Sequence, residues 1–242
     1  MAVKAACDTI AGRLRDFAAE CWQVKPEAVS FADGAVRIGT ETVAFADLVA
    51  QAYTARVQLS ATGFYATPKV EWDRSTGRGR PFYYFAYGAA VTEVALDTLT
   101  GENRILRADI LHDVGASLNP AIDVGQIEGG YVQGAGWLTM EELVWDGQGR
   151  LTTHAPSTYK IPCASDRPGI FNVALWNGRN AEDTIHRSKA VGEPPLMLGI
   201  SALMALSHAV ASCGDGGYPS LDAPATPERL LRTIDAQSGI LW

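Results

Sequence analysis

The sequence lacks any run of Lys or Arg. Its 242 residues hold 20 Lys and Arg against 27 Asp and Glu, which gives a formal net charge of −7. Nucleic-acid binding needs clustered basic side chains that neutralise phosphates, so we expect no nucleic-acid partner. A basic patch for a membrane surface is missing as well, so we also expect no membrane-surface role.

Targeting segments are also missing. Residues 1–6 contain no apolar core long enough for a signal peptide. The apolar segment after Pro195 carries Ser201, Ser207 and His208, and it is shorter than a membrane span. We therefore predict that this segment is a buried helix of a protein located in the cytoplasm.

Close pairs of metal-binding residues are absent. The four cysteines are Cys7, Cys21, Cys163 and Cys213, and none forms the close pair of a zinc or iron–sulfur site. Scattered thiols fit a reducing compartment. The four histidines show no metal-ligand spacing, and there is no P-loop and no dinucleotide-binding glycine motif. We therefore predict no protein side chain as a metal ligand.

The order of helix and strand patterns predicts an α+β fold with two parts. Residues 1–62 combine an amphipathic helix, a hairpin turning at Asp33-Gly34 and a short second helix, which together form a small α+β lobe. Residues 63–242 begin with a loop and continue with long antiparallel strands at about 82–96 and 104–111. Further helices are expected at about 122–140, 194–212 and 227–234, and a further strand at 171–176. No regular βαβ repeat is present, so α+β is the expected class.

The first helix raises a question about what covers it. Val3, Cys7, Ile10, Leu14 and Phe17 form a full apolar stripe at helical spacing. A stripe of this length needs a partner surface. We therefore expect Met1 to follow either a truncation or a split-gene boundary, with further structure upstream.

A glycine-rich segment from Asp113 to Gly136 is the first one with chemical interest. Glycines in a helix cost roughly 1 kcal/mol each relative to alanine, so several of them indicate a close approach by another helix or by a ligand. Helix packing alone accounts for the later glycines as well as a ligand does. Gly125-Gln126, expected at the helix start, is the better ligand candidate, because free N–H groups and an amide side chain can meet a phosphate or a pterin edge.

Glu193 lies between Gly192 and the pair Pro194-Pro195, directly before a strongly apolar segment. The two prolines suit the first turn of a helix and predict an extended conformation for Glu193. An acidic residue that merely favours a helix N-terminus is the simpler interpretation from spacing alone. The segment 156–162 predicts only an ordered turn.

Taken together, these segments resemble the molybdopterin-binding subunit of the xanthine dehydrogenase/aldehyde oxidase family, and bacterial xanthine dehydrogenases most. The matching stretches are LSATGFY (59–65), DVGASLNPAIDVGQIEGGYVQGAGWLTMEEL (113–143), PSTYKIP (156–162), SKAVGEPPLMLGIS (188–201) and DAPATPERL (222–230). They span most of the chain.

The resemblance implies roles for four residues. Glu193 corresponds to the general base, Val191 and Gly192 lie beside it at the molybdenum centre, and Gln126 contacts the molybdopterin. The implied activity is hydroxylation of hypoxanthine and xanthine to xanthine and urate, with oxygen taken from water. Burial beside an apolar helix is expected to raise the pKa of a base, while the helix dipole opposes that shift. Lys189 is either a supporting residue or a surface charge.

The resemblance also implies what lies outside this chain. The family's molybdenum subunit carries a long N-terminal part with further pterin contacts and purine-orienting residues. FAD and 2Fe-2S clusters are held on a different chain or domain, and the full enzyme is expected to be a higher oligomer. We therefore expect no turnover from this chain alone. Two alternatives stay open: another molybdenum hydroxylase that acts on aldehydes or N-heterocycles, and a non-catalytic scaffold fragment.

Overall fold

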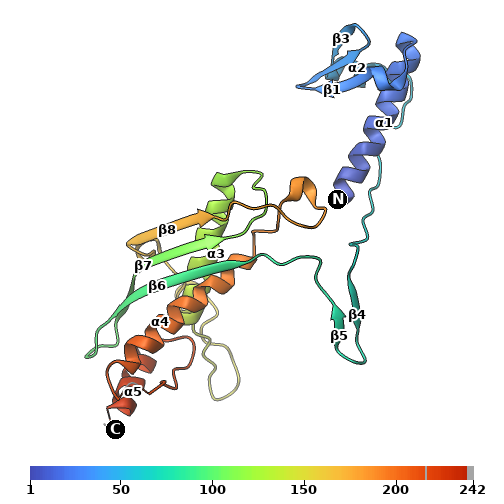
Figure 1. Ribbon diagram of the computed structural model, residues 1–242. Helices are drawn as coiled ribbons and strands as arrows, with labels where there is room; N and C mark the ends of the chain where they lie inside the picture. Colours follow the sequence, from blue (N-terminus) through green and yellow to red (C-terminus); the bar gives the residue numbers. More distant parts are fainter. Residues whose placement is uncertain (216, 239–242) are drawn as a thin grey trace. The chain divides into compact units, whose positions relative to one another are not determined.

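The computed structural model describes residues 1–215 and 217–238, and it divides into two compact units at Tyr83/Tyr84. Figure 1 shows the elements of both units along the chain. Each unit contains helices and strands, so the predicted α+β class is confirmed. The predicted boundary after residue 62 stays a prediction, while by contacts residues 63–83 group with the first unit.

The first unit contains a small three-stranded sheet and two helices. Its elements are α1 (Ala2–Trp22), η1 (Pro26–Ala28), β1 (Val29–Ala32), β2 (Ala35–Ile38), β3 (Glu41–Ala44), α2 (Phe45–Thr54), β4 (Glu71–Asp73) and β5 (Arg78–Arg80). Strands β1, β2 and β3 pair in antiparallel order. Asp33 and Gly34 both have positive φ in the β1–β2 turn, so the predicted hairpin is confirmed.

Helix α1 buries only part of its apolar stripe. Leu14 is buried, whereas Val3 is 77% exposed and Cys7 is exposed. The segment that carries the LSATGFY stretch packs along the same helix. A Cβ atom on Gly63 would lie 1.9 Å from the carbonyl oxygen of Ala2, so only glycine permits this approach.

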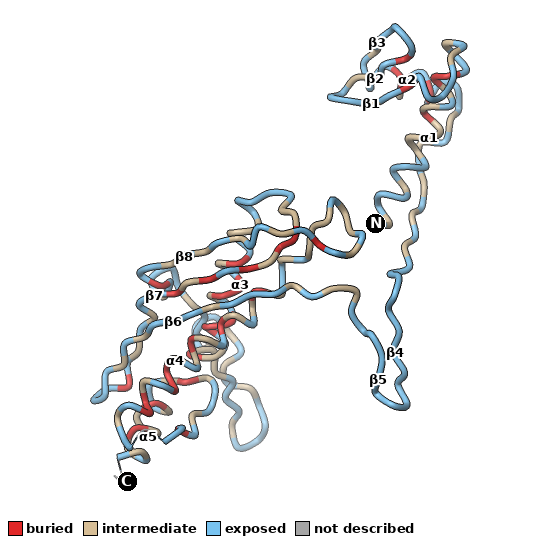
Figure 2. Tube along the Cα trace, viewed as in Figure 1, coloured by how far each residue is buried: buried red, intermediate tan, exposed pale blue. Residues whose placement is uncertain are grey.

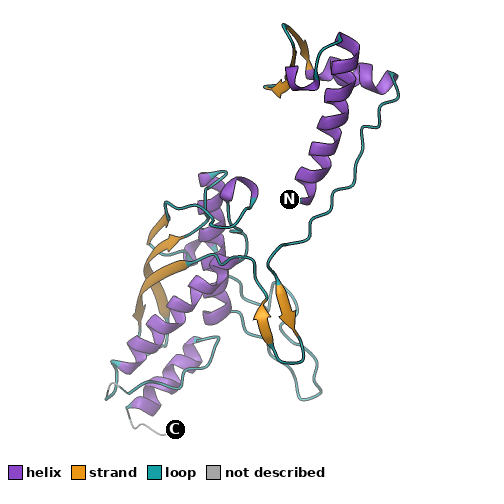
Figure 3. Cartoon of the chain, turned by 45° about the vertical axis from the view of Figure 1, so that its right-hand side comes forward, coloured by secondary structure: helices purple, strands orange, loops and turns teal. Residues whose placement is uncertain are grey.

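The second unit is built on a three-stranded sheet of order β6-β7-β8. Its elements are β6 (Gly88–Leu96), β7 (Asn103–His112), α3 (Pro120–Thr139), η2 (Ala164–Asp166), β8 (Ile170–Leu175), η3 (Ile185–Arg187), η4 (Pro194–Gly199), α4 (Ile200–Ala211) and α5 (Pro227–Gln237). Strand β6 is antiparallel to β7, and β8 is parallel to β7. Helices α3 and α4 lie on the same face of this sheet (Figure 3).

The core of the second unit lies between the sheet and these helices. Ala108 and Ile110 of β7 pack with Ile127, Tyr131 and other apolar side chains of α3. Figure 2 shows that buried residues follow β7 and the inner sides of α3 and α4, while much of β6 and β8 is exposed. Helix α5 begins as predicted, because the Thr226 hydroxyl accepts a hydrogen bond from the Arg229 N–H and Pro227 occupies the first turn.

Two predictions about this unit need correction. The segment 194–212 is a 3-10 turn followed by α4 rather than one continuous helix, since the Pro194-Pro195 pair lacks N–H donors. The same segment, Pro194–Ala211, is long and apolar enough to cross a membrane by composition, yet only 33% of it is buried. The predicted buried helix is therefore buried on one face only, and Met197, Ile200 and Met204 stay exposed.

Candidate active site

The two segments singled out in the sequence meet through an antiparallel backbone bridge between Gly115 and Ser188. The Lys189 N–H donates to the Val114 carbonyl at 2.7 Å, and the Ala116 N–H donates to the Arg187 carbonyl at 2.9 Å. Gly115 has a φ of +64°, and a Cβ there would lie 2.5 Å from the Arg187 carbonyl oxygen. Glycine is therefore required for the two segments to join at this point.

An ion pair holds the same junction. The Lys189 Nζ donates to Asp113 Oδ2 at 2.6 Å, with the two side chains 8% and 16% exposed. Lys189 also donates to the Phe85 carbonyl at 2.9 Å and lies 5.1 Å from the ring centroid of Tyr87. Lys189 is thus an interior cation with three kinds of partner, and the surface-charge alternative is wrong.

Helix α3 approaches η4 closely through its later glycines. A Cβ on Gly134 would lie 2.1 Å from the Leu196 carbonyl oxygen, and one on Gly130 would lie 2.8 Å from the Pro195 ring. A Cβ on Gly136 would meet the ring of Pro162, in the segment predicted as an ordered turn. These glycines are explained by packing within the chain.

The earlier glycines of α3 behave differently. Within the described residues, a Cβ on Gly125 or Gly129 would meet nothing within 4 Å, and both residues are exposed. Helix propensity alone disfavours glycine at such positions. Close packing among the described residues therefore does not explain these two glycines.

Gln126 lies beside the Glu193 segment. Its Oε1 atom is 3.9 Å from the position of a Cβ on Gly192, and Gln126, Gly192 and Glu193 are all exposed. Val191 is partly buried and packs against the core. The fold thus gathers all four predicted site residues at the contact between α3 and the start of η4. We call Gly125, Gln126, Gly129, Gly192 and Glu193 the open face of the site.

The position of Gln126 corrects one expectation. Helix α3 begins at Pro120, where Asn119 caps it by accepting from the Ile122 N–H, so Gly125 and Gln126 lie in the second turn. Only the first four N–H groups of a helix lack an internal partner. The backbone of Gly125-Gln126 therefore offers no free helix-start donors, and the amide side chain of Gln126 remains as the binding group.

Glu193 also differs from the expectation. Its φ and ψ are −104° and −36°, which is helical rather than extended, so the predicted extended conformation is wrong. The Glu193 carbonyl accepts from the Leu196 N–H at 3.0 Å, which closes the first turn of η4 and offsets the usual preference before proline. Its side chain makes no cap hydrogen bond. The carboxylate is therefore not used to start the helix.

The burial expected for Glu193 is not provided by the described residues, since Glu193 is exposed. Sequence reasoning also missed two supporting groups. The Tyr84 hydroxyl accepts from the Ala190 N–H at 2.9 Å, and no sequence pattern pointed to it. Asp113 opens a quoted motif, so its position could have suggested a role, but only the fold pairs it with Lys189.

His112 is a third feature that sequence reasoning missed. It is 1% exposed, and neither ring nitrogen has a hydrogen-bond partner among the described residues. Burial lowers the pKa of His112, and nearby Lys189 lowers it further while Asp113 opposes the shift. The ring is therefore neutral at pH 7. No group of three or more potential metal ligands occurs in residues 1–215 and 217–238.

Comparison with known proteins provides independent evidence for the family to which the chain belongs. A family model described as the molybdopterin cofactor-binding domain matches residues 1–168, a range that includes Gln126 and ends before Glu193. Xanthine dehydrogenase of Oryza sativa subsp. japonica is 49% identical over 197 residues, covering 77% of this chain and 14% of the relative. Xanthine dehydrogenase/oxidase of Rattus norvegicus is 50% identical over 188 residues, covering 75% and 14%.

Solved structures agree on the fold. The Cu,Mo-CO dehydrogenase superimposes with a TM-score of 0.69 at 20% identity, over 98% of this chain and 29% of that chain. Quinoline 2-oxidoreductase from Pseudomonas putida 86 gives 0.69 at 24% identity, over 95% and 28%. The chain therefore spans about one seventh of the curated relatives and less than a third of these solved chains.

Proposed function

The chain belongs to the molybdopterin cofactor-binding family of the xanthine dehydrogenase/aldehyde oxidase type, and from this we propose that it forms one side of a molybdenum hydroxylase active site, with Glu193 as the general base. The observation that carries the proposal is the approach of Gln126 to Gly192, next to Glu193. It brings together two segments more than sixty residues apart, and the close packing of Gly130 and Gly134 against Pro195 and Leu196 holds them side by side.

The open face suits a pterin. Gly125 and Gly129 leave the surface of α3 free of side chains, and the Gln126 amide offers both donors and an acceptor to a heterocycle edge. Val191 and Gly192 present backbone beside it, and the Cβ side of Gly192 has no contact closer than 3.9 Å. These residues would hold the cofactor, which supplies the oxygen-transfer and electron-accepting chemistry when bound.

Within this arrangement Glu193 accepts a proton. Its carboxylate is not engaged in capping η4, so both oxygens remain available as proton acceptors. The turn that begins at Glu193 is fixed by Pro195, which is buried against Gly130. The base is thus mounted on a rigid element, which keeps it in position for the oxygen nucleophile.

The substrate we propose is a purine. The relatives at 45–50% identity are named xanthine dehydrogenase or xanthine dehydrogenase/oxidase, which favours hypoxanthine and xanthine over aldehydes. The chain spans only 14% of those relatives, so we propose that turnover also requires the rest of the molybdenum subunit and the iron–sulfur and FAD domains.

The decisive variant is Glu193→Gln in the assembled enzyme. It keeps the shape of the side chain and removes the proton acceptor, so kcat for xanthine is expected to fall by about 10²–10⁴-fold. Molybdenum and pterin content are expected to stay at the wild-type level. Glu102→Gln, in the turn between β6 and β7, is the matched control and should leave kcat unchanged. An unaltered kcat in Glu193→Gln would remove Glu193 from the chemistry.

A further inference from the structure

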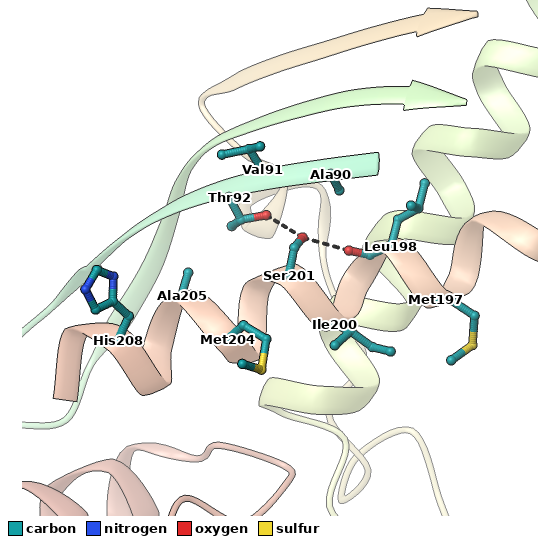
Figure 4. Close-up of a pocket in the computed structure, with 10 residues that line it drawn as sticks. All are labelled: Ala90, Val91, Thr92, Met197, Leu198, Ile200, Ser201, Met204, Ala205 and His208. Atoms are coloured by element: carbon teal, nitrogen blue, oxygen red, sulfur yellow. Dashed lines mark hydrogen bonds between the residues drawn. The ribbon is translucent and has the colours of Figure 1, made fainter. Parts of the chain in front are cut away.

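A groove of about 500 Å³ lies between β6 and the η4–α4 segment, and no residue of the open face lines it. Figure 4 shows the side chains around it. They are Ala90, Val91, Thr92, Met197, Leu198, Ile200, Ser201, Met204, Ala205 and His208. None of them is Asp, Glu, Lys or Arg, so an apolar occupant suits the groove better than a charged one.

The two hydroxyl groups in the groove, of Thr92 and Ser201, already have hydrogen-bond partners within the chain. The Thr92 hydroxyl is 2.7 Å from the Ser201 hydroxyl and 2.8 Å from the Tyr131 hydroxyl. Ser201 in turn donates to the Leu198 carbonyl at 2.7 Å (Figure 4). An occupant therefore need not offer polar side chains to these hydroxyl groups, and burying them costs no hydrogen bond, while the lining's other polar side chain, His208, is exposed.

The side of the groove formed by η4 and α4 is an exposed apolar stripe. Met197, Ile200 and Met204 are 58%, 41% and 47% exposed, at the spacing that puts them on one side of consecutive turns. The whole segment Pro194–Ala211 is apolar enough to cross a membrane, yet only a third of it is buried. A contiguous apolar surface of this kind marks an interaction site.

The β6 side offers a free sheet edge. Strand β6 has nine residues and, within the described chain, pairs only with β7. Its other edge borders the groove through Ala90, Val91 and Thr92. An edge of this length with unpaired backbone groups accepts an added strand, and alternate side chains of that strand would point into the neighbouring groove.

We propose that an extended apolar segment from the remainder of the molybdenum hydroxylase subunit pairs with β6 and fills this groove. The proposal rests on the proposed function. We favour this occupant because about six sevenths of the length of each relative lies outside the region that this chain matches. A lipid surface fits less well, since the lining holds no Lys or Arg to meet anionic headgroups.

The test places the photo-crosslinker benzoylphenylalanine at position 204 in the protein as it occurs in its own cells. Met204 is half-exposed, so the replacement is compatible with folding. Mass spectrometry then identifies the peptide joined to it. We expect a peptide of molybdenum hydroxylase sequence from outside these 242 residues, and we expect the product to be lost when Ile200→Glu is added.

The control carries the same crosslinker at Leu99, an exposed apolar residue in the β6–β7 turn, and should give no such product. Four outcomes at position 204 would each overturn the proposal: a cross-link to a second copy of this chain, a cross-link to a lipid, a cross-link to an unrelated protein, or no cross-linked product. Cross-linking does not depend on turnover. If no cross-linked product forms at position 204 but Glu193→Gln lowers kcat as expected, only the proposed occupant of the groove is refuted. If the product forms but Glu193→Gln leaves kcat unchanged, only the role of Glu193 as the base is refuted.

Discussion

The Lys189 Nζ lies 2.6 Å from the Asp113 Oδ2, and this buried ion pair joins the end of β7 to the segment that carries Glu193. Asp113 also accepts a hydrogen bond from the Gly115 N–H at 2.8 Å, so one carboxylate organises both sides of the junction. The pair positions the residues at the site without touching a reacting group.

Removing the cation from this pair should be costly. Lys189→Met removes the counter-charge of the part-buried Asp113 carboxylate and leaves it the Gly115 N–H as a hydrogen-bond donor, so the loss of unfolding free energy is expected to reach up to about 3–5 kcal/mol. Urea unfolding of the chain measures the loss. Lys4→Met is the control, because the Lys4–Asp8 pair is 55% and 62% exposed and such pairs contribute about 0–1 kcal/mol. Equal losses in the two variants would contradict the buried role.

Alanine at two glycines of α3 should have opposite effects on stability. Gly134→Ala forces a Cβ against the Leu196 carbonyl and should cost about 1–3 kcal/mol. Gly125→Ala meets nothing within the described residues, so it should stabilise the helix by up to about 1 kcal/mol. Thermal unfolding of the chain without cofactor compares them. Because Gly125 belongs to the open face proposed to hold the cofactor, we also expect Gly125→Ala to lower the pterin content of the assembled enzyme.

Gln126→Leu tests the binding group directly. The change keeps a side chain of similar size and removes the amide, so one hydrogen bond to the cofactor is lost. Loss of about 1.4 kcal/mol corresponds to about tenfold weaker cofactor retention. Molybdenum and pterin are measured after dialysis of the assembled enzyme. Gln133→Leu, exposed two turns further along α3, should retain both at the wild-type level. Full retention by Gln126→Leu would exclude this contact.

His112 should make the stability of the second unit sensitive to acid. Because its pKa is lowered in the folded chain, the unfolded state binds a proton first as pH falls below about 6.5. The contribution from neutral His112 is thus complete above that pH, and it is lost progressively down to the lower folded pKa. Unfolding free energies at pH 7.5 and 5.5 measure the difference, which should shrink in His112→Gln. An unchanged difference would mean that His112 does not titrate on unfolding.

Local pattern was enough to predict most elements. The Asp33-Gly34 turn, the Thr226-Pro227 helix start and the paired strands β6 and β7 follow from residue preferences over a few positions, and the structure confirms them. The conformation of Glu193 was predicted wrongly, because its carbonyl accepts from the Leu196 N–H in a turn whose Pro195 packs against Gly130 of α3, and these contacts outweigh the local preference before proline.

Residue identity also marked Gln126 and Glu193 as chemically interesting, since their neighbouring glycines and prolines restrict the backbone locally. The tertiary structure alone decided that these residues meet, that Lys189 is buried against Asp113, and that Gly134 serves packing while Gly125 does not. The physical reason is that periodicity and turn chemistry act over a few residues. Burial and pairing depend instead on segments separated by more than sixty positions, which only the packed fold brings together.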